Sequence, residues 1–218
     1  MQFTSSEENY IKAIYHLEII HGKVSTSLLS DKIRTRPASV TDMLKKLQLK
    51  HIVHYKPYRG FILTQSGTKT ALEVVRKHRL WEYFLVHKLG FQWDEVHAVA
   101  EDLEHISSKE LISRLDAYLD NPAFDPHGDP IPDNNGKIRI IKQSSLAAIS
   151  TKQTVTVSSV KNQSTEMLDM LKHFNIHIGS KIKIQRRFDF DGSVEIKVDK
   201  NPATIISNQV AINVYCLI

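Results

Sequence analysis

The chain has 218 residues, of which 41% are hydrophobic and 24% charged, a balance typical of a folded protein with a sizeable core. No stretch approaches the roughly 20 apolar residues needed to cross a bilayer, and the polar, acidic N-terminus does not resemble a secretory signal. We therefore expect a cytoplasmic protein. A single cysteine, Cys216, excludes an internal disulfide and any zinc finger that needs two thiolates.

The net charge of +5 is unevenly distributed. Residues 1–72 contain 11 Lys and Arg against 5 Asp and Glu, residues 73–125 contain 6 against 11, and the remainder contains 12 against 8. A basic first segment suits a polyanion such as nucleic acid, whereas an acidic segment that also contains histidines suits cations.

The first 50 residues have the pattern of three short helices. A capping-box spacing at Ser5–Glu8 precedes a helical periodicity that extends from about Ser6 to His21. Ser25 can cap a second helix, and Pro37, which is favourable in a first turn, begins a third. This arrangement predicts a helix-turn-helix.

Two strand-like segments, His51–Tyr55 and Phe61–Thr64, follow the third helix. The turn formers Pro57 and Gly60 lie between them. We expect this hairpin to be the wing of a winged helix.

The middle of the chain is predicted to be helical. One long helix extends from Ser66 to about Lys88, and Asp94 caps a second one that ends near Ile106. The spacing of Ser107 and Glu110 repeats the capping box and begins a third helix.

Residues 121–136 contain four of the seven prolines and two of the glycines, which predicts an irregular segment, and we place a linker at about 121–145. Beyond it the hydrophobic period changes to that of strands, with one helix at Thr165–Phe174. The predicted strands are Thr154–Val160, Lys181–Arg187, Val194–Val198 and Val210–Leu217. The fold class is therefore α+β and multidomain, with a winged helix at 1–72, a helical domain at 73–136 and a small β-barrel at 137–218.

His97, Glu101, Glu104 and His105 have a spacing that places all four on one side of a helix. His78 and Glu82 are likewise one turn apart on the preceding helix. Imidazoles and carboxylates in this arrangement can bind a divalent metal, but the same spacing also occurs on solvated helix faces. Spacing alone leaves both interpretations open.

An enzyme is a weaker interpretation. The zinc-hydrolase motif His-Glu-x-x-His is absent, and its inverted form fails because the first position is Glu101. The chain also lacks a glycine-rich phosphate loop and a nucleophile elbow. We expect a protein without catalytic activity, with a metallohydrolase or a metal-storage protein as the alternatives.

The third helix and the wing carry polar and basic residues that suit DNA, since short polar groups can contact base edges while cations contact phosphates. The alternative is an ordinary solvated helix. The predicted DNA-binding residues are Arg34, Arg36, Ala38, Ser39, Thr41, Asp42, Lys45, Lys46, Lys56 and Arg59.

Several spaced motifs resemble the diphtheria-toxin-repressor family of iron- and manganese-dependent regulators, and the likeness covers nearly the whole chain. Phe124–Pro132 and Glu166–Ser180 are most similar to the three-domain manganese regulators, whose third domain is SH3-like. The other motifs are Tyr10–Tyr15, Pro37–Thr41, Tyr58–Gly60, Arg76–Leu80 with Glu82, and Glu101–His105.

The resemblance implies two metal sites. The primary, regulatory site would consist of Asn9, Glu101, Glu104 and His105, although Asn9 departs from the family's usual Asp or Met. The ancillary site would consist of His78, Glu82, His97, Asp125, His127 and Glu166, with Gln163 as a further candidate. Asp125 departs from the Cys of related manganese regulators.

The resemblance also implies a homodimer that binds operator DNA when it is loaded with metal and that represses genes for metal uptake. Glu101 replaces the Cys of the iron-type branch, and this oxygen ligand favours Mn(II). Fe(II) is the alternative, and Zn(II) can occupy such a site in vitro.

Overall fold

The computed structural model describes residues 2–56 and 60–218, and the chain divides into two compact units. The first unit contains residues 2–56, 60–78, 101–112 and 132–137, and the second contains residues 79–100, 113–131 and 138–218. The long helix α4 (Gln65–Leu89) contributes residues to both.

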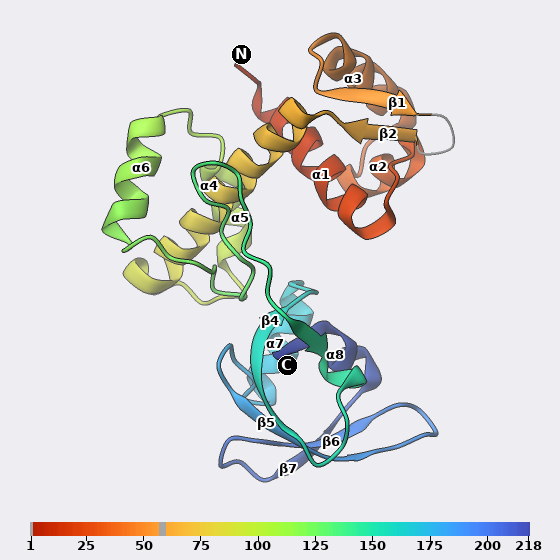
Figure 1. Ribbon diagram of the computed structural model, residues 1–218, viewed down its shortest axis with the longest axis vertical. Helices are drawn as coiled ribbons and strands as arrows, with labels where there is room; N and C mark the ends of the chain where they lie inside the picture. Colours follow the sequence, from red (N-terminus) through yellow and green to blue (C-terminus); the bar gives the residue numbers. More distant parts are fainter. Residues whose placement is uncertain (1, 57–59) are drawn as a thin grey trace. The chain divides into compact units, whose positions relative to one another are not determined.

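The first unit begins with three helices and a two-stranded antiparallel hairpin, the winged helix-turn-helix predicted from the sequence (Figure 1). Its elements are α1 (Ser5–His21), α2 (Thr26–Ile33), α3 (Pro37–Leu49), β1 (Val53–Lys56) and β2 (Gly60–Leu63).

Local capping explains where these helices begin. Thr4, not Ser5, caps α1, and the Glu7 side chain completes the capping box, so the predicted box was displaced by one residue. Ser25 caps α2 by accepting a hydrogen bond from the backbone of Leu28, and Pro37 begins α3, as predicted.

An apolar core joins the three helices to the hairpin, with Ile11, Leu29 and Leu44 fully or almost fully buried. At the hairpin, Gly60 has a positive φ of 70°, and a Cβ there would lie 2.3 Å from the backbone oxygen of Val24. Only glycine therefore allows this close approach of the strand to the segment before α2.

Two predictions about the central helices were wrong at the helix ends. The helix α5 (Val96–Leu103) stops before Ile106, so Glu104 and His105 lie in the turn after it and not on its face. The next helix, α6 (Lys109–Tyr118), is capped by Ser108, whose hydroxyl accepts a hydrogen bond from the backbone of Leu111, and not by Ser107.

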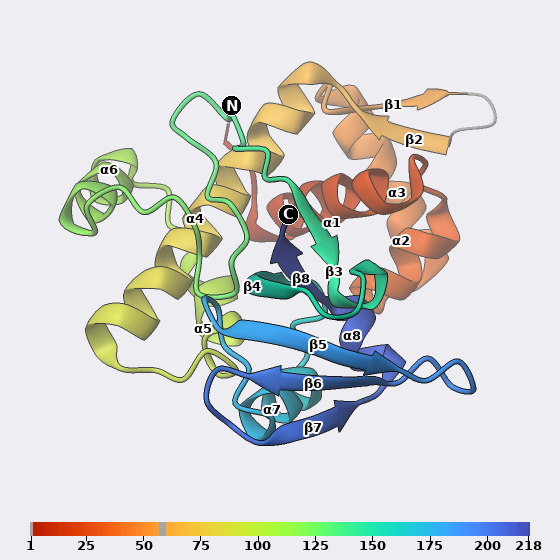
Figure 2. The same cartoon turned by 60° about the horizontal axis from the view of Figure 1, so that its bottom comes forward.

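The second unit contains a six-stranded antiparallel sheet in the order β3-β8-β4-β5-β6-β7, and the strands β5, β6 and β7 run side by side in Figure 2. This sheet is the predicted SH3-like β domain. Its elements are β3 (Gln143–Ser145), the short helix η1 (Leu146–Ala148), β4 (Thr154–Val160), α7 (Thr165–His173), β5 (Lys181–Arg187), β6 (Val194–Val198), β7 (Ala203–Ile206), α8 (Asn208–Asn213) and β8 (Val214–Leu217).

Three of the four predicted strands match in their bounds, but the prediction of a strand over Val210–Leu217 was wrong in its first half. Ser207 accepts a hydrogen bond from the backbone of Val210 and caps α8, so the chain turns helical before β8 begins at Val214. Val210 and Ala211 are nevertheless buried, so the apolar side chains of this segment contribute to the core as part of a helix.

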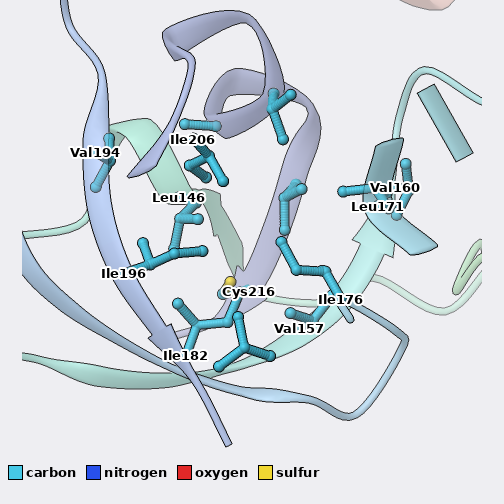
Figure 3. Packing of buried hydrophobic residues seen from close by; sticks show 14 of the residues in the cluster. Leu146, Val157, Val160, Leu171, Ile176, Ile182, Val194, Ile196, Ile206 and Cys216 are labelled. Carbon is cyan, nitrogen blue, oxygen red and sulfur yellow. The ribbon is translucent and has the colours of Figure 1, made fainter. Parts of the chain in front are cut away.

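Apolar side chains from the sheet and from α7 fill the core of this domain (Figure 3). Cys216 is buried among them, and burial raises the pKa of its thiol to about 12. The thiol is therefore neutral at physiological pH and acts as a small apolar group. Over residues 2–56 and 60–218, no helix has both the length and the apolarity that a membrane span requires.

Candidate metal centres

The first cluster of candidate ligands surrounds Glu104, which is fully buried within the first unit. The ammonium of Lys12, on α1, lies 2.6 Å from Oε1 and 2.7 Å from Oε2 of this carboxylate. His78, on α4, lies with Nδ1 2.6 Å from Oε2. Oε2 therefore has two close hydrogen-bond partners, whereas Oε1 has the ionic contact with Lys12 but no hydrogen bond among the described residues.

The charges of these partners decide the ionisation of Glu104. Burial by itself would raise the pKa of this carboxyl, but the hydrogen bond from His78 and the charges of Lys12 and His78 outweigh burial and lower it. Glu104 is consequently a carboxylate at neutral pH.

His105, the next residue, is held by a second carboxylate from α1. Its Nδ1 lies 2.6 Å from Oε2 of Glu8, and because a carboxylate only accepts, Nδ1 donates the proton. The other ring nitrogen, Nε2, lies 3.7 Å from Oε1 of Glu104. A carboxylate on one nitrogen of a histidine is the arrangement that orients the other nitrogen toward a metal.

The structure brings three of the four predicted primary ligands together. Glu101 is half-exposed, and its Oε1 lies 3.7 Å from the ammonium of Lys12, beside Glu104 and His105. Asn9 lies exposed on α1, and no side-chain hydrogen bond joins it to another described residue. The amide oxygen is therefore available at the surface of the helix that carries Glu8 and Lys12.

Sequence reasoning missed Glu8 and Lys12. One signal was present, since Glu8 directly precedes Asn9 and Lys12 lies one helical turn after Glu8 on α1. Their partners lie 97 and 92 residues away, so no local pattern could pair them.

The second cluster lies within the second unit and consists of Glu82, Asp125 and His127, all buried. One ligand atom from each lies within 4.8 Å of the others. Glu82 comes from α4, whereas the other two come from the irregular segment that the prolines predicted.

The hydrogen bonding of His127 fixes which ring nitrogen is available. Its Nε2 lies 2.7 Å from the backbone oxygen of Trp93, and because a carbonyl only accepts, Nε2 carries the proton. In a neutral ring Nδ1 then has the free electron pair, 3.9 Å from Oε2 of Glu82. Within the described part of the chain, no hydrogen bond reaches this buried nitrogen. An unpartnered imidazole nitrogen beside two carboxylates fits a divalent cation.

Backbone contacts hold the segment in place. Oδ1 of Asp125 accepts hydrogen bonds of 2.9 Å from the backbone nitrogens of His127 and Asp129. Gly128 has a φ of 84°, and a Cβ there would lie 1.9 Å from the backbone oxygen of Ser158 on β4. The segment that carries Asp125 and His127 therefore packs closely against β4 at a position that only glycine permits.

The ionisation of Asp125 is governed by its burial and by its neighbours. Burial and the charges of Glu82 and Asp129 together raise the pKa of this carboxyl to about 8, although Arg79 and a backbone hydrogen bond from Asp129 lower it. Arg79 contacts Asp125 and Asp129 at 3.3 and 3.6 Å. A proton is therefore retained on Asp125 at neutral pH.

The remaining predicted ancillary ligands have different surroundings. Nδ1 of His97 lies 3.3 Å from Oε1 of Glu82, so this half-exposed ring borders the second cluster. Gln163 instead donates a hydrogen bond of 3.1 Å to Asp129, and Glu166 is exposed in the first turn of α7. His78 contacts Glu104, in the first cluster.

The predicted DNA-binding residues on α3 and just before it are exposed, as is Lys56 at the end of β1. Arg34 adopts a left-handed conformation with a φ of 56° and ends α2. A hollow at this turn is lined by Ser30, Asp31, Arg34, Thr35, Arg36 and Ser39. The Thr41 hydroxyl donates to the backbone oxygen of Pro37, and Arg59 lies outside the described residues.

Comparisons with known protein families cover nearly the whole chain. Residues 2–61 match the N-terminal DNA binding domain of the iron dependent repressors, and residues 64–133 match their metal binding and dimerisation domain. Residues 144–216 match the FeoA domain.

Among curated proteins, the iron-dependent repressor IdeR of Mycobacterium bovis is 31% identical over 131 residues, which cover 60% of this chain and 57% of the relative. The regulator MntR of Oceanobacillus iheyensis is 35% identical over 112 residues, which cover 51% of this chain and 76% of the relative. The matched part thus spans little more than half the length of IdeR.

Solved structures match over almost the full length. A manganese-dependent transcriptional repressor in complex with manganese is 32% identical, with a TM-score of 0.87 over 97% of this chain and 99% of that one. The manganese regulator SloR is 29% identical, with a TM-score of 0.77 over 96% and 97%. These relatives are regulators and not enzymes, which agrees with the analysis of the sequence. The chain belongs to the diphtheria toxin repressor family of metal-dependent transcriptional repressors.

Proposed function

We propose that the protein is a cytoplasmic homodimeric repressor that binds operator DNA when loaded with Mn(II) and represses genes for metal uptake. The donors of both clusters are oxygen and nitrogen atoms without sulfur, a set that suits Mn(II). Fe(II) is the second candidate, because the relative IdeR is an iron-dependent repressor. Zn(II) binds such donors strongly enough to occupy them in vitro.

The primary site consists of Asn9, Glu101, Glu104 and His105. The ancillary site is built on Glu82, Asp125 and His127, with His97 at its border and with His78, Gln163 and Glu166 as the other expected ligands. At the primary site, a divalent ion would supply the positive charge that draws the carboxylates, the imidazole and the amide oxygen together.

One observation carries this proposal: α1 belongs to the DNA-binding helices and also contacts the candidate ligands. It packs against α2 and α3, and it also holds His105 through Glu8 and Glu104 through Lys12. A change of charge at Glu104 and His105 therefore acts on the helix that supports the DNA-contacting helix α3.

Metal loading then favours one placement of the winged helix within the dimer, so that two copies of α3 contact successive major grooves about 34 Å apart. Because coupling between two binding events is reciprocal, operator DNA must tighten metal binding by the same factor by which metal tightens DNA binding.

The test is a fluorescence-anisotropy titration of the protein on its own upstream DNA with Mn(II), Fe(II), Zn(II) or chelator. The wild-type protein should bind tightly only with metal, and at lower concentrations of Mn(II) than of Fe(II). The double variant Glu101→Ala, His105→Ala should remain a folded dimer without metal-dependent binding. Unchanged metal dependence in this variant would refute the primary site, and metal binding without any operator binding would indicate a storage protein.

A further inference from the structure

The Lys12 side chain lies against the buried carboxylate of Glu104. Its side chain is 13% exposed, and its ammonium contacts both oxygens of a carboxylate that has no exposure at all. The same ammonium lies 3.7 Å from Glu101. The ammonium of a single lysine thus lies close to two of the candidate primary ligands.

The position of this charge conflicts with that of a divalent ion. A metal bound to Glu104 needs at least one of the two oxygens that Lys12 contacts at 2.6 and 2.7 Å. Two cations that share one buried carboxylate repel each other strongly, because the protein interior screens charge less than water does. Lys12 has a flexible four-carbon stem, so its ammonium can move away when a stronger cation binds.

We propose that Lys12 is a built-in competitor of the metal at Glu104 and thereby sets the metal concentration at which the repressor is loaded. This inference rests on the proposed primary site. Lys12 neutralises Glu104 in the absence of metal, so the buried carboxylate costs little stability, and the metal binds only by displacing an ammonium. Lys12 therefore raises the metal concentration that is needed to load the site, and it stabilises the folded protein when no metal is bound.

The decisive experiment compares the full-length protein with Lys12→Gln, which retains a hydrogen-bond donor but removes the charge. Lys12→Arg retains the charge. Lys77→Gln is the matched control, because Lys77 is similarly buried and contacts Glu8 at 3.3 Å but has no described contact with Glu104. Mn(II) affinity is measured by competition with a fluorescent chelator, and thermal unfolding is measured with and without Mn(II).

Lys12→Gln should bind Mn(II) on the order of 10- to 100-fold more tightly, since the metal no longer displaces a charge. Its unfolding midpoint should fall without metal and recover when Mn(II) saturates the site. Lys12→Arg and Lys77→Gln should stay close to wild type in affinity. Unchanged or weaker Mn(II) binding by Lys12→Gln would overturn the inference.

A second measurement uses the unmodified protein and so does not depend on the folding of a variant. Amine acetylation followed by mass spectrometry should show Lys12 reacting faster when Mn(II) is bound, while Lys77 reacts at an unchanged rate. Equal protection of Lys12 with and without Mn(II) would contradict displacement. If Glu104→Gln binds Mn(II) as wild type does, the proposed primary site itself fails, which is a different outcome from either of these.

Discussion

The two clusters of candidate ligands solve the problem of buried charge in opposite ways. Around Glu104, Lys12 of α1 and His78 of α4 contact the carboxylate, and the pKa of its carboxyl is lowered. Around Asp125, burial and the neighbouring carboxylates of Glu82 and Asp129 outweigh the contact with Arg79, and the pKa of the Asp125 carboxyl is raised to about 8. In the first cluster a lysine ammonium contacts the buried carboxylate, whereas in the second cluster the buried carboxyl retains its proton.

At the proposed sites, a metal ion would therefore replace a different partner in each cluster. At the first cluster it would displace the ammonium of Lys12, and at the second it would displace a proton and could bind Nδ1 of His127, which has no hydrogen-bond partner among the described residues. Metal binding at the second cluster should therefore depend more strongly on pH, and metal binding at the first should depend more strongly on Lys12.

The largest effect is expected from Glu104→Gln. The change leaves the Lys12 ammonium and the His78 ring without their buried carboxylate, and we expect the free energy of unfolding to fall by about 3 kcal/mol. Urea unfolding of the metal-free protein measures it. Glu101→Gln is the control, because its side chain is 52% exposed and should cost less than about 1 kcal/mol. Equal losses would show that Glu104 is not the centre of the first cluster.

The next effect should come from Gly128→Ala. The added Cβ would meet the backbone oxygen of Ser158 at 1.9 Å in a left-handed conformation, so we expect a loss of about 2 kcal/mol or more and weaker metal binding at the second cluster. Gly179→Ala has a similar φ of 90° but no atom within 4 Å of its Cβ, so it isolates the backbone strain. Thermal unfolding and metal titration measure both variants. A matching loss of metal affinity in Gly179→Ala would contradict the local explanation.

A smaller effect should appear in the pH dependence of stability. Asp125 binds a proton in the folded protein up to about pH 8 but loses it near pH 4 when unfolded, so the metal-free protein should lose stability as the pH rises between these values. The slope from one proton is at most about 1.4 kcal/mol per pH unit. Glu104 contributes to the pH dependence of stability with the opposite sign. Because the pKa of its carboxyl is lowered in the folded protein, its stabilising contribution is lost as the pH falls into the acid range.

Asp125→Asn should flatten the decline between about pH 4 and 8 while it keeps the two backbone hydrogen bonds to its side-chain oxygen. Chemical unfolding of both proteins at pH 5 to 9 provides the comparison. Parallel profiles for wild type and variant would show that Asp125 is ionised throughout and that the second cluster retains no proton.

The smallest effect is expected from Lys45→Gln on the exposed face of α3. It should weaken binding to all DNA sequences a few-fold and reduce the slope of affinity against salt by about 1, because one phosphate contact is lost. Metal affinity at both clusters should stay the same. Lys200→Gln on the β domain is the control, and an equal salt effect there would assign the DNA contact to another face.

Elements whose signals are local were predictable in detail. The strands Thr154–Val160, Lys181–Arg187 and Val194–Val198 match the sequence periodicity residue for residue, and the capping positions Ser25 and Pro37 fix the helices α2 and α3. The errors occur where a local signal is ambiguous. At Val210–Asn213 a β-branched composition adopts a capped helical turn, and α5 ends at Leu103 without a terminating glycine or proline.

The sequence by itself determined the winged helix, the central helices and three strands of the β domain, because helix and strand periods and caps act over a few neighbouring residues. It did not predict β3, β7, η1 or α8, and it offered Asp125 and His127 only through the family resemblance. Only the tertiary structure decided that His78 contacts Glu104, that Glu8 holds His105, and that Lys12 neutralises a carboxylate 92 residues away. Such pairs depend on which side chains the packed helices bury together, and burial removes the solvent that would otherwise screen their charges.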